Sequence, residues 1–138
     1  MLTLVGLRCL IVDDSAGFCQ AARALLEQEG MTVVGVAATC DEALRRVVEL
    51  RPDVTLVDID LGGCSGCDLA RQLADEAGGA AGCLILISAH AEEEFADLIE
   101  ASPAAGFLPK PALSADAIRE LIPGSPDGPA VASAPRGT

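Results

Sequence analysis

The sequence predicts an α/β fold with a parallel sheet, and three features of the chain support that prediction. Short apolar runs alternate with longer segments in which apolar residues recur at helical spacing. The runs are mostly continuous in β-branched residues and leucine, as in strands that helices cover on both faces. Acidic, hydroxyl or basic residues follow four of these runs, at the edge of a parallel sheet where ligands bind.

Five apolar runs are predicted to be strands, because each is short and enriched in residues that favour strands. They cover residues 8–12, 32–36, 54–57, 84–87 and 106–108. Strands that alternate with helices imply a parallel sheet with right-handed crossovers, so we expect helices on both faces.

Five amphipathic helices are predicted between and after the strands, because apolar residues recur there every three or four positions. In chain order these positions are Phe18, Ala22, Leu25 and Leu26; Ala43, Leu44, Val47 and Val48; Cys67, Ala70, Leu73 and Ala74; Phe95, Leu98 and Ile99; and Ala117, Ile118, Leu121 and Ile122.

Four of these helices have a start signal in the sequence. Thr39 and Glu42 form a capping-box pattern before the second helix. Ser65 is the expected N-cap of the third helix, and Ser114 precedes the fifth. Three acids at 92–94 precede the fourth helix, where negative charge suits the helix dipole.

The composition limits the class of protein. A chain of 138 residues fits one domain. Its net charge of −12 argues against direct binding to nucleic acid or to an anionic membrane, both of which require a basic face. No apolar run is long enough to span a membrane, and the start of the chain lacks the pattern of a signal peptide. We therefore expect a cytoplasmic protein, in which the six cysteines would be reduced.

The end of the chain differs in composition from the rest. Four of the eight prolines lie in 123–138, and no apolar periodicity continues there. The sequence predicts one domain over 1–122 and a disordered tail or truncated linker over 123–138.

Five polar residues mark the predicted site: Asp13, Asp14, Asp58, Ser88 and Lys110. Three carboxylates at one sheet edge would repel each other, and a bound cation would relieve that repulsion. A few hard oxygen ligands suit Mg²⁺, which keeps waters and a phosphate oxygen in its shell. Taken singly, each residue has a more ordinary interpretation as a helix cap, a turn residue or a surface charge. Their joint placement at four strand ends favours a site.

Asp58 is the candidate nucleophile, because a carboxylate at the end of the third run could accept a phosphoryl group. The loose transition state of phosphoryl transfer needs positioning and positive charge more than acid–base chemistry. Beside the cation, Lys110 would contact one phosphoryl oxygen. The Ser88 hydroxyl and the backbone N–H of Ala89 would contact another.

Four segments carry a resemblance to a known family: LIVDDS at 10–15, PDVTLVDID at 52–60, LILISAH at 84–90 and GFLPKP at 106–111. Together they resemble the receiver domain of bacterial two-component response regulators, over about residues 7–122. The likeness is to stand-alone, chemotaxis-regulator-like receivers. It implies a flavodoxin-like doubly wound (βα)5 fold with strand order 2-1-3-4-5.

The resemblance implies the roles of the site residues. Asp58 would be the phosphoacceptor. Asp14 and Asp58 would bind Mg²⁺ (or Mn²⁺) directly, Asp13 would bind it largely through water, and Asp60 would bind it through its main-chain carbonyl. Lys110 would pair with the phosphoryl group.

The resemblance also implies a switch. Ser88 would move toward the phosphoryl group, and the ring of Phe107 would swing inward behind it. The expected output surface is the fourth helix, fifth strand and fifth helix. Asp60 and His90 would tune the lifetime of the phosphoryl group, and the Lys110–Pro111 peptide would be cis.

The implied partners are a histidine kinase or phosphotransfer protein and a downstream protein target, with a homodimer possible on phosphorylation. Self-phosphorylation and self-dephosphorylation would be the only chemistry. One alternative is the receiver fragment of a longer DNA-binding regulator. Another is a haloacid-dehalogenase-like phosphatase, suggested by Asp58 and Asp60, although those enzymes place metal-binding acids after the lysine and few residues follow Lys110 here.

The loop after Asp60 departs from the family pattern. The usual Met-Pro-Gly is replaced by Leu61, Gly62 and Gly63, which predicts a more mobile loop. Cys64 and Cys67 then form a CxxC spacing at a predicted helix start, where a thiolate pKa would be lowered. A redox role for this pair and an incidental pair of small residues both remain open.

Overall fold

Five parallel strands form one sheet in the computed structural model, which describes residues 7–61, 63–76, 78–89 and 96–122. The strand order is β2-β1-β3-β4-β5, as expected. The strands are β1 (Arg8–Val12), β2 (Thr32–Ala37), β3 (Val54–Asp58), β4 (Cys83–Ser88) and β5 (Gly106–Pro109). Every predicted strand is present, and no predicted end is wrong by more than one residue.

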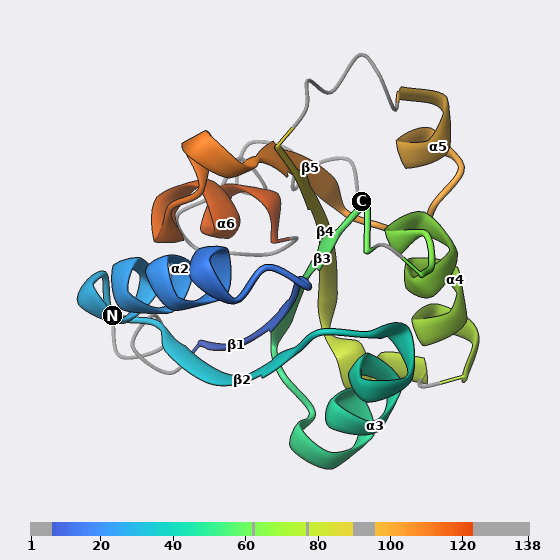
Figure 1. Cartoon of the computed structure of the whole chain (residues 1–138), viewed down its shortest axis with the longest axis horizontal. Helices are drawn as coiled ribbons and strands as arrows, with labels where there is room; N and C mark the ends of the chain where they lie inside the picture. The colour runs from blue at the N-terminus through green and yellow to red at the C-terminus, as the bar shows by residue number, and fades with distance from the viewer. Residues whose placement is uncertain (1–6, 62, 77, 90–95, 123–138) are drawn as a thin grey trace, which may run out of the picture.

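Helices cover both faces of the sheet (Figure 1). One face carries α2 (Ala16–Gln28) and α6 (Ala115–Leu121), and the other carries α3 (Cys40–Leu50), α4 (Gly66–Glu76) and α5 (Ala96–Glu100). Two short 3-10 turns, η1 (Gly78–Ala81) and η3 (Lys110–Ala112), precede β4 and follow β5. The arrangement is the flavodoxin-like doubly wound fold.

The sheet divides the core into two separate clusters. Along β1, Leu10 and Val12 pack into the cluster on the α3 and α4 side, whereas Cys9 and Ile11 pack into the cluster on the α2 and α6 side. Successive strand residues point to opposite faces, so a strand covered on both sides must be apolar throughout. This explains why the strand runs are continuous rather than alternating.

The predicted caps begin their helices. The Thr39 hydroxyl accepts a hydrogen bond from the N–H of Glu42 at 3.1 Å, and the Ser65 and Ser114 hydroxyls accept from Cys67 and Ala117. The capping box is modified, because the Glu42 carboxylate accepts from the N–H of Ala38 rather than from that of Thr39.

Some predictions concern residues outside the described ranges. The acidic run 92–94, Phe95 and the segment 123–138 are among them, so the start of the fourth helix and the nature of the tail stay predictions. Ile99 in α5 packs against the α3 and α4 cluster, as its helical spacing predicts. Within the part of the chain that the structure describes, no helix has the length and apolar character needed to cross a membrane.

Candidate phosphoryl and metal site

The ends of four strands bring the predicted polar residues to one edge of the sheet. Asp13 directly follows β1, Asp58 ends β3, Ser88 ends β4 and Lys110 directly follows β5. Because β1, β3, β4 and β5 are neighbours in the sheet and run parallel, their carboxyl ends lie together.

Lys110 links two of the acids. Its Nζ atom lies 2.7 Å from Asp13 Oδ2 and 3.3 Å from Asp58 Oδ2. The side chains of Asp13 and Asp58 are 0% and 8% exposed, so both carboxylates have lost most of their hydration. Buried carboxylates require a counter-charge, and the ammonium of Lys110 supplies it here.

Asp58 is held at the middle of the sheet edge. Its Oδ1 atom accepts a hydrogen bond from the backbone N–H of Asp60 at 3.1 Å, while Oδ2 faces Lys110. Burial raises the pKa of Asp58 above its ordinary value, and the charge of Asp13 adds to the rise. The Asp60 N–H and Lys110 act in the opposite direction. The carboxylate is therefore desolvated and oriented, which is what a nucleophile at this position requires.

Lys110 is positioned by an aromatic ring as well as by acids. Its Nζ atom lies 4.4 Å from the centroid of the Phe18 ring, a cation–π contact. Burial pulls the pKa of Lys110 down, but the contacts with Asp13 and Asp58 together outweigh this and hold the pKa above its ordinary value. The lysine therefore stays charged.

The sequence indicated Phe18 only as an apolar helix position. Helical spacing predicts which face of the helix carries the Phe18 ring. It does not predict that a charged side chain from another element, Lys110, contacts that ring. The one signal available was the rarity of aromatics, since the chain has three phenylalanines and no tyrosine or tryptophan.

The expected cis peptide between Lys110 and Pro111 is wrong. Among the residues that the structure describes, no peptide bond is cis. Lys110 and Pro111 instead enter the turn η3, in which the Lys110 carbonyl accepts the N–H of Leu113 at 3.1 Å. Trans is the form that an X–Pro bond prefers intrinsically, by about 0.5–1 kcal/mol, and the contacts in this turn do not reverse that preference.

The acids fit a hard divalent cation. Asp13, Asp14 and Asp58 each offer an oxygen, and these oxygens lie within 4.8 Å of one another. Asp13 Oδ2 is buried and forms an ion pair with Lys110 Nζ at 2.7 Å. It accepts no hydrogen bond of normal geometry from the described residues. Asp14 is exposed and open to solvent. A set of carboxylates with one solvent-facing member suits Mg²⁺, which keeps part of its water shell.

The remaining predicted residues occupy the β4 and β5 side of this edge. Ser88 is buried, and its position in β4 places its side chain on the same sheet face as Leu86. Phe107 pairs in register with Leu86 and packs against that same cluster, half-buried. Ala89 is exposed directly after Ser88, and His90 lies outside the described residues.

The cysteines differ from the expectation in two ways. Cys40 and Cys64 form a disulfide, so the prediction of six reduced thiols is wrong for these two. Cys67 is free and buried in α4, and burial raises its pKa, so the proposed low-pKa CxxC pair is also wrong. Spacing along the chain suggested Cys67 as the neighbour of Cys64, but helix formation from Gly66 turns Cys67 into the core.

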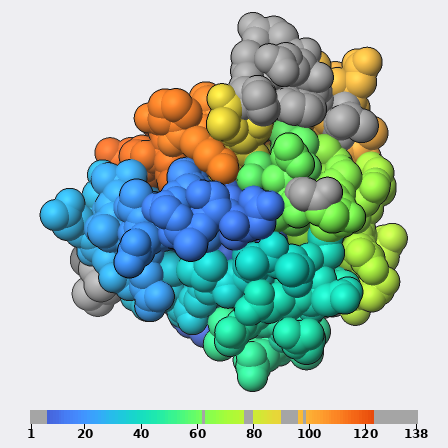
Figure 2. All heavy atoms as spheres, viewed as in Figure 1, coloured from blue at the N-terminus to red at the C-terminus, as the bar shows by residue number. Residues whose placement is uncertain are grey.

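The site is bordered by the loop that carries Cys64. The start of α2, in blue, the loop after β3, in green, and the start of α3, in teal, adjoin on one face of the molecule (Figure 2). Segments far apart in the sequence thus share the surface around the sheet edge.

Comparison with known proteins identifies a shared domain. The sequence model of the response regulator receiver domain matches residues 9–122. The protein-glutamate methylesterase/protein-glutamine glutaminase 5 of Myxococcus xanthus is 37% identical over 123 residues, covering 88% of this chain and 35% of that protein. The uncharacterized transcriptional regulatory protein YvfU of Bacillus subtilis is 31% identical over 122 residues, covering 86% of this chain and 60% of that protein.

A solved structure agrees with these matches. The signal receiver domain of a modulated diguanylate cyclase from Desulfovibrio desulfuricans G20 is 34% identical, with a TM-score of 0.69 over 83% of this chain and 88% of that one. The chain spans less than two thirds of the length of the two curated relatives. The activities in their names therefore concern those longer proteins.

Proposed function

The chain belongs to the response regulator receiver domain family, and we propose that Asp58 accepts a phosphoryl group from a histidine kinase or a phosphotransfer protein. The observation that carries this assignment is the placement of a desolvated Asp58 carboxylate 3.3 Å from Lys110 Nζ, beside two further acids. Asp13 also contacts Lys110, but its side chain is 0% exposed, whereas Asp58 keeps 8% exposure and ends β3, the central strand of the sheet.

The chain's own residues position the reacting atoms. The Asp60 N–H holds one oxygen of Asp58, so the other is directed toward Lys110. That oxygen forms the new bond to phosphorus as the bond to the donor breaks. Lys110 then balances negative charge on the transferred group, and the Ser88 hydroxyl and the Ala89 N–H receive its remaining oxygens.

A divalent cation completes the proposal. When bound, Mg²⁺ or Mn²⁺ supplies positive charge to the phosphoryl oxygens. Asp14 and Asp58 would hold it directly, Asp13 largely through water, and Asp60 through its main-chain carbonyl. The all-oxygen donor set supports a hard cation of this kind.

The proposed output is a change of surface. Ser88 ends β4 and Phe107 lies in the neighbouring strand β5, on the α5 side of the sheet, and movement of Ser88 toward the phosphoryl group would let the Phe107 ring turn inward. Such a switch is a two-state equilibrium that local charge biases. Asp60 and His90 would set how long the phosphoryl state lasts.

The proposed partners are proteins. The downstream target would dock on the α5, β5 and α6 surface, and a phosphorylation-dependent homodimer would use the same surface. The acidic chain argues against direct contact with nucleic acid. The YvfU match supports a second candidate, in which residues 1–122 are the receiver of a longer transcriptional regulator. The receiver match argues against the phosphatase alternative, and no chemistry beyond self-phosphorylation and self-dephosphorylation is proposed.

Acetyl phosphate tests the assignment. With Mg²⁺ present, the intact mass should rise by one phosphoryl group, and Asp58→Asn should not gain it. Asp53→Asn is a matched control, because Asp53 is an exposed acid before β3, at the opposite end of that strand. No gain in the wild-type chain, even from a phosphorylated donor protein, would overturn the assignment.

A further inference from the structure

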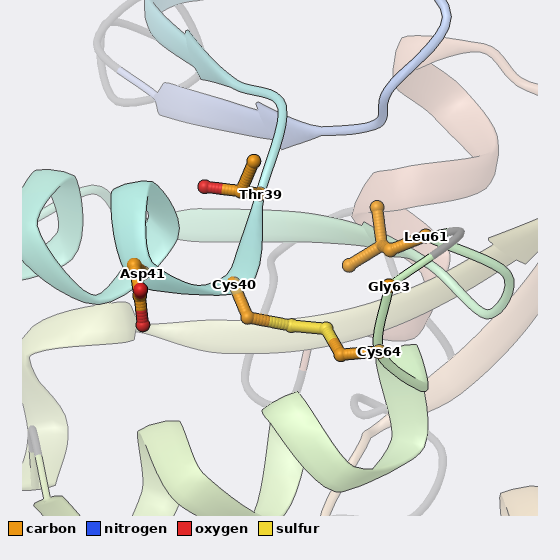
Figure 3. A pocket seen from close by; sticks show the side chains of 6 residues that line it. All are labelled: Thr39, Cys40, Asp41, Leu61, Gly63 and Cys64. Carbon is orange, nitrogen blue, oxygen red and sulfur yellow. A yellow bond between two sulfur atoms is a disulfide. The ribbon is translucent and has the colours of Figure 1, made fainter.

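The Cys40–Cys64 disulfide joins two elements beside the site. Cys40 is the first residue of α3, and Cys64 lies in the loop between β3 and α4, with a Cα–Cα distance of 6.7 Å. That distance lies within the range that a disulfide spans. Figure 3 shows the two sulfur atoms bonded across the gap between the helix start and the loop.

The bridge is open to a small reactant. Cys40 and Cys64 are half-buried and line a cavity of about 300 Å³ together with Thr39, Asp41, Leu61 and Gly63 (Figure 3). A cavity of this size at the surface admits a small thiol. The family match, the fold and the phosphoryl site leave this cavity without a role.

The other four cysteines are poorly suited to exchange. Cys9, Cys19 and Cys67 are buried, and Cys83 is half-buried. Burial raises the pKa of Cys9 to about 12 and that of Cys19, with help from Asp13, to about 11. Because the thiolate is the reactive form, these thiols are protected at neutral pH.

The loop that carries Cys64 is connected to Asp58 by short steps. Asp60 donates its N–H to the Asp58 carboxylate and pairs with Ser65 across the loop. The N–H of Leu61 donates to the Cys64 carbonyl at 3.2 Å. A covalent link from Cys64 to α3 therefore restrains the segment that carries Asp60, whose N–H contacts Asp58 and whose carbonyl is proposed to bind the cation.

We infer that Cys40 and Cys64 form a redox site, open to thiol–disulfide exchange, whose oxidised state holds the loop after β3 ready for phosphorylation of Asp58. The link to phosphorylation rests on the function proposed above. A dithiol, from a protein or a small molecule, is the chemical class of reductant.

The exchange balances without any further reactant. One thiolate of the dithiol attacks a sulfur of the bridge, forms a mixed disulfide and displaces the other sulfur as a thiolate. The second thiol of the reductant then displaces the remaining cysteine and closes its own disulfide. Two electrons pass to Cys40 and Cys64, and each released thiolate takes a proton from solvent.

Thiol counting tests the bridge itself. The full chain, purified without reductant, is denatured, alkylated with iodoacetamide and weighed. Four alkylated cysteines are expected before treatment with dithiothreitol and six after it. Native alkylation after mild reduction should label Cys40 and Cys64 first. Six labels without reductant, even after incubation with oxidised glutathione, would overturn the inference.

Phosphorylation by acetyl phosphate tests the coupling. The oxidised chain should be phosphorylated at least about threefold faster than the reduced chain, a smaller effect than loss of a direct supporting contact to a metal ligand. The Cys40→Ser/Cys64→Ser variant should be phosphorylated at the rate of the reduced chain, and dithiothreitol should not change that rate. Cys83→Ser, which removes a thiol outside the loop, should still respond. Equal rates in both states would overturn the coupling.

Mg²⁺ binding separates failure of this inference from failure of the proposed function. If neither state accepts a phosphoryl group, the proposed function fails, and calorimetric titration with Mg²⁺ then tests the coupling. Tighter binding by the oxidised chain, absent in the double variant, would support the inference. Equal affinities would contradict it.

Discussion

The chain after β3 and the chain after β5 both deliver a residue to the site, but they are held in different ways. After β3, the loop is fixed through its backbone and a covalent bridge: Asp60 pairs with Ser65, and Cys64 is bonded to Cys40. After β5, Lys110 is followed by a single turn, and its side chain is placed by charge and a ring. One end therefore depends on covalent and steric constraints, and the other on electrostatics.

The comparison predicts that the β3 end is the more sensitive to added atoms. A Cβ at Gly66 would collide with the Asp58 carbonyl oxygen and lie 2.8 Å from Ile59 Cα. Gly66→Ala should lower the free energy of unfolding by more than about 3 kcal/mol, because backbone rather than a flexible side chain must move. Urea denaturation of the variant and the unchanged chain measures this difference in the free energy of unfolding. Gly63→Ala, where a Cβ meets nothing within 4 Å, is the control. Equal stability of the two variants would contradict the steric account.

Loss of the bridge should have the next largest effect. The disulfide closes a segment with a sequence separation of 24. Chain-entropy arguments give about 3.5 kcal/mol of stabilisation for a loop of this size, and engineered bridges often deliver less than this value. Cys40→Ser/Cys64→Ser should therefore shift the urea midpoint downward, and dithiothreitol should shift the wild-type midpoint equally. A wild-type urea midpoint that is the same with and without dithiothreitol would show that the bridge does not constrain the unfolded chain.

Removal of the charge at the β5 end should act mainly on the reaction. Lys110→Met keeps the length of the side chain but leaves Asp13 and Asp58 without their ammonium partner. The phosphorylation rate should fall by about a hundredfold, and stability without Mg²⁺ should fall by about 2 kcal/mol. Added Mg²⁺ should restore part of the lost stability, which thermal melts with and without the ion would reveal. An unchanged rate would remove Lys110 from the site.

The same electrostatic dependence predicts a response to alkaline pH. The pKa of Lys110 is raised by its acids, so its stabilising charge is fully present below the ordinary lysine pKa and is lost as pH rises through the raised value. Stability in the absence of metal should fall above about pH 10.5. The buried thiols of Cys9 and Cys19 act in the same direction from about pH 9. Lys110→Met should therefore reduce the fall in the free energy of unfolding only above about pH 10.5. Urea denaturation at each pH measures this free energy.

The smallest effect is expected at the ring. Phe18→Leu keeps an apolar side chain in α2 but removes the cation–π contact with Lys110. Cation–π contacts contribute about 0.5–1 kcal/mol where they are exposed and more where they are desolvated, so phosphorylation is expected to be at least about two- to fivefold slower. The rate of phosphorylation by acetyl phosphate measures the effect, and a rate equal to that of the unchanged chain would show that the ring does not position Lys110.

The sequence predicted the sheet and the site edge well because both depend on local patterns. Continuous apolar runs mark strands covered on both faces, and a polar residue at the end of a run marks the edge. The acids and Lys110 meet for that reason, although the roles assigned to them stay predictions. The Cys40–Cys64 bridge could not be predicted in this way, because its cysteines belong to different elements and CxxC spacing pointed to Cys67. The contact of Phe18 with Lys110 likewise depends on how α2 meets the end of β5.

The two core clusters have a consequence for how this domain diversifies. The sheet keeps the α2 and α6 side apart from the α3 and α4 side, and none of the residues that the structure describes belongs to both clusters. Substitutions in separate clusters have nearly additive effects on stability, since they share no packing partner. A lineage could therefore remodel one face to recognise a new partner without disturbing the packing of the other. The acids at the strand ends would stay in register, so partner choice and phosphoryl chemistry could evolve at different rates.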